Sequence, residues 1–71
     1  MKPAILVVDD DHAVCDLLQD ALSEHALLVY RCHQGKDALT MVCEHPDISL
    51  VMLDMMLPDT NGLLVLQQLQ R

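Results

Sequence analysis

The chain has 71 residues, enough for one small domain, and 52% of them are hydrophobic, a share too high for a disordered tail. Its formal net charge of −7 argues against binding of nucleic acid by this segment, because a phosphate backbone would be repelled. No apolar run approaches the roughly 20 residues that cross a bilayer, and Met1-Lys2-Pro3 does not begin a signal peptide, so we expect a soluble, cytoplasmic chain without a membrane partner.

The first predicted element is a strand over Ala4–Val8, an unbroken apolar run rich in β-branched residues. Such a run is typical of a strand that is covered on both faces, as in parallel sheets. It ends at three aspartates. A helix over His12–Glu24 is predicted next, with Asp11 placed as its N-cap. Its apolar residues recur at spacings of three and four and form one stripe: Val14, Leu17, Leu18, Ala21 and Leu22.

A second strand and helix follow the same pattern. The apolar run Ala26–Cys32 predicts a strand, and Gly35 opens a predicted helix over Lys36–Glu44. The apolar face of this helix is predicted to hold three residues: Ala38, Leu39 and Val42. Pro46 ends the helix, because proline has no backbone N–H and disfavours helical geometry in the residue before it.

The third pair completes the order βαβαβα. Leu50–Leu53 is a fully apolar strand that ends at Asp54, and Asn61-Gly62 is a turn or cap that leads into a helix over Leu63–Arg71. Short connections with intervening helices imply an α/β fold with a parallel, right-handed, doubly wound sheet.

Three carboxylates stand at the ends of two predicted strands: Asp9 and Asp10 after the first, and Asp54 after the third. Ligands of open parallel sheets bind at the carboxyl ends of the strands. Neighbouring strands lie about 4.8 Å apart, so these side chains converge if the two strands are neighbours. Their repulsion would push at least one toward protonation unless a cation offsets it. Mg²⁺ suits such an all-oxygen site, and the pattern therefore predicts a magnesium pocket.

Sequence segments around these carboxylates resemble a known family. They are Ile5-Leu6-Val7-Val8-Asp9-Asp10-Asp11, Gly35-Lys36-Asp37-Ala38-Leu39 and Leu53-Asp54-Met55-Met56-Leu57-Pro58-Asp59-Thr60-Asn61-Gly62. Together they resemble the receiver domains of two-component response regulators, over the whole length of the chain. Separated motifs at the right interval make this match more specific than either motif alone. The resemblance implies the flavodoxin-like receiver fold, here with strand order 2-1-3.

The resemblance also implies a function for named residues. Asp54 would be the phosphoacceptor, the nucleophile that takes a phosphoryl group from the phosphohistidine of a sensor histidine kinase. Asp10 and Asp54 would be direct Mg²⁺ ligands, Asp9 would act mostly through water, and the main-chain carbonyl of Met56 would supply a further oxygen. Two residues would shape the loop: Pro58 and Gly62. The chain would then be a signalling domain that controls an output domain, with transcription as the expected output, rather than an enzyme.

Some parts of the family pattern have no counterpart among the 71 residues. A receiver usually continues through two more strands, which bring a Thr or Ser and a Lys to the site. We therefore expect residues 1–71 to be a partial receiver domain, with strands four and five absent and any DNA binding left to a missing output domain. The third strand would be an open edge with uncovered apolar surface, which predicts homo-oligomers.

Two alternative functions remain open from the residues. The strand before Asp9-Asp10-Asp11 imitates the DxD motif of haloacid-dehalogenase-type phosphohydrolases, in which Asp9 would be the nucleophile. That family has Gly-Thr or a similar pair where this chain has His12-Ala13, and it gives no role to Asp54. The second alternative is a receiver-like interaction module that never takes a phosphoryl group.

Overall fold

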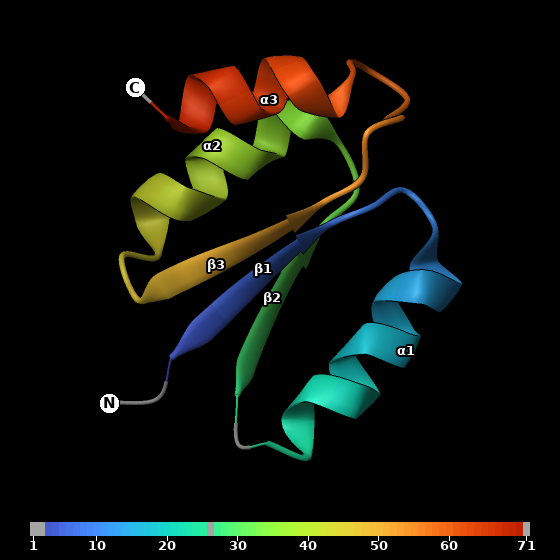
Figure 1. Ribbon diagram of the computed structural model, residues 1–71, viewed down its shortest axis with the longest axis vertical. Helices are drawn as coiled ribbons and strands as arrows, with labels where there is room; N and C mark the ends of the chain where they lie inside the picture. Colours follow the sequence, from blue (N-terminus) through green and yellow to red (C-terminus); the bar gives the residue numbers. More distant parts are fainter. Residues whose placement is uncertain (1–2, 26, 71) are drawn as a thin grey trace.

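The computed structural model describes residues 3–25 and 27–70, and these have the predicted order βαβαβα (Figure 1). The elements are β1 (Ala4–Val8), α1 (His12–Ser23), β2 (Leu28–Cys32), α2 (Gly35–Glu44), β3 (Ile48–Leu53) and α3 (Gly62–Leu69). The strands form a parallel sheet in the order β2-β1-β3. The predicted fold class, the parallel sheet and the strand order are confirmed.

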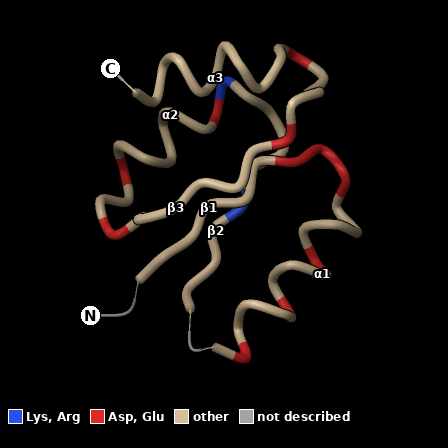
Figure 2. Tube along the Cα trace, viewed as in Figure 1, with Lys and Arg blue, Asp and Glu red and all other residues tan. Residues whose placement is uncertain are grey.

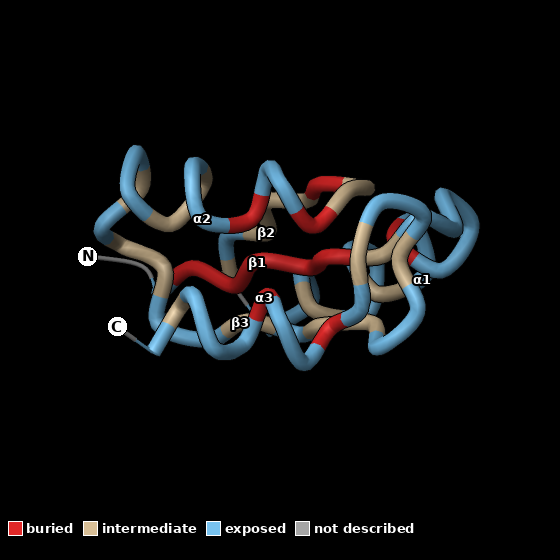
Figure 3. Tube along the Cα trace, turned by 90° about the horizontal axis from the view of Figure 1, so that it is seen from above, coloured by how far each residue is buried: buried red, intermediate tan, exposed pale blue. Residues whose placement is uncertain are grey.

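Strand β1 is the centre of the molecule, because all five of its residues are buried (Figure 3). Successive side chains of a strand point to opposite faces of the sheet. Ile5 and Val7 pack against Cys15 of α1 on one face. Leu6 and Val8 pack on the other face, which α2 and α3 cover (Figure 1). This three-layer arrangement explains why the sequence of β1 is apolar without alternation.

Two strands begin at residues other than the predicted ones. Strand β3 begins at Ile48 rather than Leu50, because Ile48 pairs with Ala4 before an irregularity shifts the register. Strand β2 begins at Leu28, and the predicted start, Ala26, lies outside the described residues.

The helices begin and end close to the predicted residues. Asp11 caps α1 as expected, since its carboxylate accepts hydrogen bonds from the main-chain N–H groups of Ala13 (2.9 Å) and Val14 (3.4 Å). Helix α1 ends at Ser23, one residue early, and the predicted end of α3, Arg71, lies outside the described residues. None of the helices within residues 3–25 and 27–70 is long and apolar enough to cross a membrane.

The buried faces of α1 and α2 are narrower than predicted. Cys15, Leu18 and Leu22 pack toward the sheet, whereas Leu17 is 69% exposed. Consecutive residues of a 3.6-residue helix lie about 100° apart, so Leu17 and Leu18 cannot both face the sheet. The same holds in α2, where Ala38 is buried and Leu39 is 42% exposed. Leu17 and Leu39 belong to the predicted apolar stripes but lie outside the buried faces, as do Val14 and Ala21 in α1.

Candidate metal site at the carboxyl edge of the sheet

The parallel sheet brings three carboxylates to one edge. Strands β1 and β3 are neighbours with Val8 opposite Leu53, and the N–H of Asp54 donates to the carbonyl of Val8 (2.9 Å). Asp9, Asp10 and Asp54 each offer an oxygen, and these oxygens lie within 4.8 Å of one another. Figure 2 shows the acidic segments meeting where β1 and β3 end. The structure thus brings together the three carboxylates that the sequence singles out.

The donor set of this cluster fits a hard divalent cation. All three side chains offer oxygen, which is the ligand type that Mg²⁺ prefers, and Mg²⁺ keeps several waters when it binds to proteins. Asp9 and Asp54 are half-buried and Asp10 is exposed, so one side of the cluster is open to water. A groove of about 310 Å³ borders the cluster, with Leu18 and Met52 among its lining residues.

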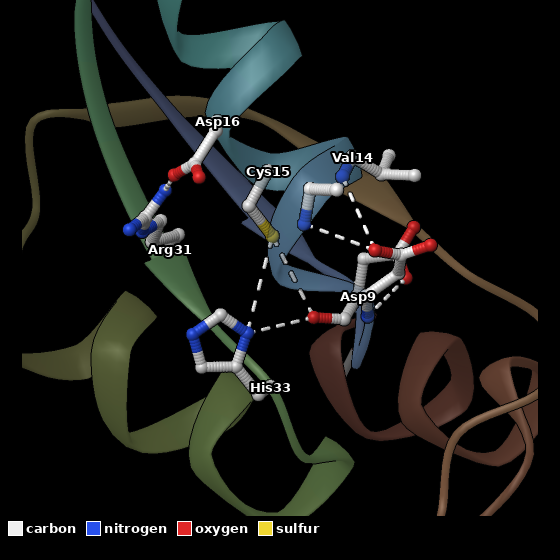
Figure 4. A network of polar contacts seen from close by, with 8 residues as sticks. Asp9, Val14, Cys15, Asp16, Arg31 and His33 are labelled. Carbon is white, nitrogen blue, oxygen red and sulfur yellow. Dashed lines mark hydrogen bonds and ion pairs between the residues drawn. The ribbon is translucent and has the colours of Figure 1, made fainter.

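The main chain at Asp9 is held by groups from α1 and from the turn that follows β2 (Figure 4). Nδ1 of His33 lies 2.8 Å from the carbonyl oxygen of Asp9, and the thiol of Cys15 donates to the same oxygen at 3.6 Å. A carbonyl only accepts, so His33 carries its proton on Nδ1 in this contact. Burial, followed by the charge of Asp9, raises the pKa of the Cys15 thiol, which keeps it in the protonated, donating form. These bonds fix the direction in which the chain leaves β1.

Residues 54–62 fold back on themselves, and we call this segment the 54–62 hairpin. Met56 and Asn61 form an antiparallel bridge. Two main-chain hydrogen bonds flank it: Gly62 N–H to the Met55 carbonyl (2.9 Å) and Leu57 N–H to the Thr60 carbonyl (3.1 Å). In this pattern the N–H and C=O of Met56 both face away from Asn61. The N–H donates to Oδ1 of Asp54 (3.1 Å), so the carbonyl of Met56 faces the same side as that carboxylate.

The two residues predicted to shape the loop occupy different parts of the hairpin. Pro58 is exposed near the tip. Gly62 lies at the base, where a Cβ would be 2.6 Å from the carbonyl oxygen of Asp54 and 2.8 Å from Cα of Met55. Both of these are backbone atoms, so only glycine allows the start of α3 to approach Asp54 this closely.

The sequence pattern assigned no role to Asp59, although the structure gives it one. Its two carboxylate oxygens accept hydrogen bonds from the main-chain N–H groups of Gly35 (2.8 Å) and Lys36 (2.9 Å), at the start of α2. These hydrogen bonds lower the pKa of Asp59, and the bond from Gly35 has the largest effect. A partial signal existed: the N-cap of α2 is Gln34, which is not a preferred cap residue and makes no side-chain cap bond. The helix start therefore needed a partner from elsewhere in the chain.

Curated proteins similar to this chain include regulatory proteins and response regulators. The chain is 36% identical over 70 residues to the regulatory protein VanR of Enterococcus faecium. It is 43% identical over 70 residues to the response regulator MprA of Mycobacterium ulcerans. Each alignment covers 99% of this chain and 30% of the relative, so the chain spans less than a third of the length of these relatives.

Solved structures with the same fold are receiver domains. A signal receiver domain from Vibrio parahaemolyticus superposes with a TM-score of 0.89 at 26% identity, over 99% of this chain and 53% of that one. The BeF3-activated N-terminal receiver domain of RstA from Klebsiella pneumoniae superposes with a TM-score of 0.88 at 30% identity, over 94% of this chain and 56% of that one. The family model for the response regulator receiver domain matches residues 5–71. The chain belongs to the response regulator receiver domain family.

Proposed function

We propose that the chain is a phosphoacceptor domain in which Asp54 takes a phosphoryl group from the phosphohistidine of a sensor histidine kinase. Mg²⁺ would be held by Asp9, Asp10, Asp54 and the main-chain carbonyl of Met56. One observation carries this proposal: three carboxylate oxygens from the ends of two neighbouring strands lie within 4.8 Å of one another in a chain of the receiver family.

Asp54 is suited to act as the nucleophile. Its Oδ1 accepts a hydrogen bond from the N–H of Met56. Its Oδ2 accepts no hydrogen bond in the described part of the chain, so this oxygen is free to attack phosphorus. In the transfer, a bond forms between Oδ2 and phosphorus while the P–N bond of the phosphohistidine breaks, and the electron pair stays on the imidazole nitrogen. The product is an acyl phosphate at the end of β3.

The other groups of the site orient the reacting carboxylate and offset its negative charge. Mg²⁺, when bound, supplies positive charge that offsets the carboxylates and the oxygens of the transferring group. The bonds from Cys15 and His33 hold the main chain of Asp9, and the N–H of Met56 orients the carboxylate of Asp54. Each of these contacts exists before any partner binds, so the side chains need little rearrangement to react.

The wider role that we propose is a cytoplasmic signalling function with a transcriptional output. It rests on the relatives, among them an uncharacterized transcriptional regulatory protein of Bacillus subtilis, YrkP, at 37% identity over 71 residues. In this proposal residues 1–71 are the N-terminal part of a receiver, and any DNA contact belongs to an output domain. The net charge of −7 supports this division, because this segment would repel a phosphate backbone.

Phosphorylation by a small-molecule donor tests the proposal. The complete receiver, which in this proposal continues beyond residue 71, is incubated with acetyl phosphate and Mg²⁺, and its intact mass is measured. We expect one added phosphoryl group in the wild type, none in Asp54→Asn and none when EDTA removes the cation. Mg²⁺ binding without phosphorylation would instead favour an interaction module, and equal labelling of Asp54→Asn would contradict the assignment of the nucleophile.

A further inference from the structure

We propose that Asp59 is a positioning residue for the acidic site. It fastens the tip of the 54–62 hairpin to the start of α2, and so holds the carbonyl of Met56 and the carboxylate of Asp54 in the arrangement that binds the cation. What the site does rests on the proposed function, but the contact itself, which we call the Asp59 tether, does not.

The tether joins two segments that are far apart in the sequence. Its two hydrogen bonds, to Gly35 and Lys36, span 24 and 23 residues. The first N–H groups of a helix have no partner within the helix, and a negative charge near them is favourable. Gln34 makes no side-chain cap bond, so Asp59 takes the place of a local cap. Both carboxylate oxygens are used, which fixes the orientation of the hairpin tip as well as its distance from α2.

Close packing accompanies the two hydrogen bonds. A Cβ at Gly35 would collide with Cγ2 of Thr60 and would lie 2.8 Å from Cγ2 of Val65. Glycine therefore lets the start of α2 lie directly against the hairpin and the first turns of α3. The hairpin tip cannot move toward α2, because side chains already fill the space, and the tether prevents it from moving away.

Other bonds between the hairpin and the preceding chain would make the tether redundant. In the described residues, the hydrogen bonds that join residues 55–61 to any residue before Asp54 are the two made by Asp59. The remaining bonds of the hairpin are internal or lead to α3. Without the tether, packing alone, such as that of Leu57 against the core, restrains the hairpin, and Met56, three residues from Asp59, shifts with any movement of it. The carbonyl of Met56 accepts no hydrogen bond from the described residues, so its direction depends on how the hairpin that carries it is held against the rest of the chain.

Mg²⁺ affinity, measured by calorimetric titration of the chain, gives a readout that does not depend on phosphorylation. Asp59→Ala removes both bonds, and we expect its dissociation constant to rise roughly tenfold, as for the loss of other residues that orient metal ligands. Asp59→Asn keeps one acceptor oxygen and is expected to fall between wild type and Asp59→Ala. Asp47→Ala is the matched control: it removes the same group at the opposite end of β3, where the carboxylate accepts from the hydroxyl of Tyr30 (3.2 Å). We expect this control to bind Mg²⁺ as the wild type does.

Amide hydrogen exchange without Mg²⁺ tests the tether separately from the proposed function. In Asp59→Ala we expect faster exchange at Gly35, Lys36 and Met56, and unchanged exchange in β1. Wild-type exchange at Met56 together with wild-type Mg²⁺ affinity in Asp59→Ala would overturn the inference. If the wild type binds no Mg²⁺, the proposed function fails while exchange still decides the tether. If Asp59→Ala does not fold, the same two measurements on Asp59→Asn decide it.

Discussion

Replacing Gly62 by alanine tests whether the close approach of α3 to Asp54 shapes the site. The new Cβ would lie 2.6 Å from the carbonyl oxygen of Asp54, and an ordinary contact begins at 3.4 Å, so backbone must move by 0.8 Å (3.4 − 2.6). Forcing backbone shifts in a packed region costs about 1–3 kcal/mol. Alanine in a helix recovers up to about 1 kcal/mol relative to glycine. We therefore expect a net loss of up to about 2 kcal/mol in the free energy of unfolding.

Urea denaturation measures this loss, and calorimetric titration measures Mg²⁺ affinity in the same variant. Because the displaced atoms belong to Asp54 and its neighbour Met55, we expect the Mg²⁺ affinity to fall as well. Gln67→Ala, on the exposed side of α3, is the control and should change neither quantity. Wild-type stability together with wild-type Mg²⁺ affinity in Gly62→Ala would refute the argument that this contact shapes the site.

Three further predictions concern the metal site, the surface and the thiols. Asp10→Ala should bind Mg²⁺ more weakly than wild type, whereas Asp20→Ala near the end of α1 should not; equal affinities by titration would remove Asp10 from the site. Strand β3 is an edge of the sheet and its Leu50 is 55% exposed, so we expect homo-oligomers in sedimentation equilibrium, and a monodisperse folded monomer at high micromolar concentration would contradict this. Burial raises the pKa of Cys32 from 9.0 to about 11, so the folded chain holds this proton more tightly than the unfolded chain. The free energy of unfolding, measured in urea, should therefore fall as the pH rises from 9 toward 11; Cys32→Ala should make this fall smaller, and an unchanged fall in that variant would contradict the prediction.

Local sequence patterns were enough to predict the fold. The apolar runs of β1 and β3 end at aspartates, and in a parallel sheet the carboxyl ends of neighbouring strands lie on one edge. The convergence of Asp9, Asp10 and Asp54 therefore follows from the strand order alone. The irregular start of β3 could not be predicted from the sequence, because the pairing of Ile48 with Ala4 depends on a register shift that no local pattern signals.

The contacts that were missed depend on the packed chain rather than on periodicity. A stripe that contains both Leu17 and Leu18 does not determine how α1 is rotated about its own axis, because the two side chains point about 100° apart. Packing against Ile5 and Val7 turns Leu18 toward the sheet. The Asp59 tether joins residues 24 and 23 positions apart and replaces a cap that local sequence does not provide. Such a bond becomes visible only when the hairpin and α2 are placed side by side.

The most direct test of the central claim is to locate the phosphoryl group within the chain. After reaction with acetyl phosphate and Mg²⁺, the protein is cleaved and the modified residue is identified by tandem mass spectrometry. The account predicts modification at Asp54 in the wild type and in Asp47→Ala, and none in Asp54→Asn. Modification at Asp9 would contradict it, because the nucleophile would then follow β1, as in the haloacid-dehalogenase alternative.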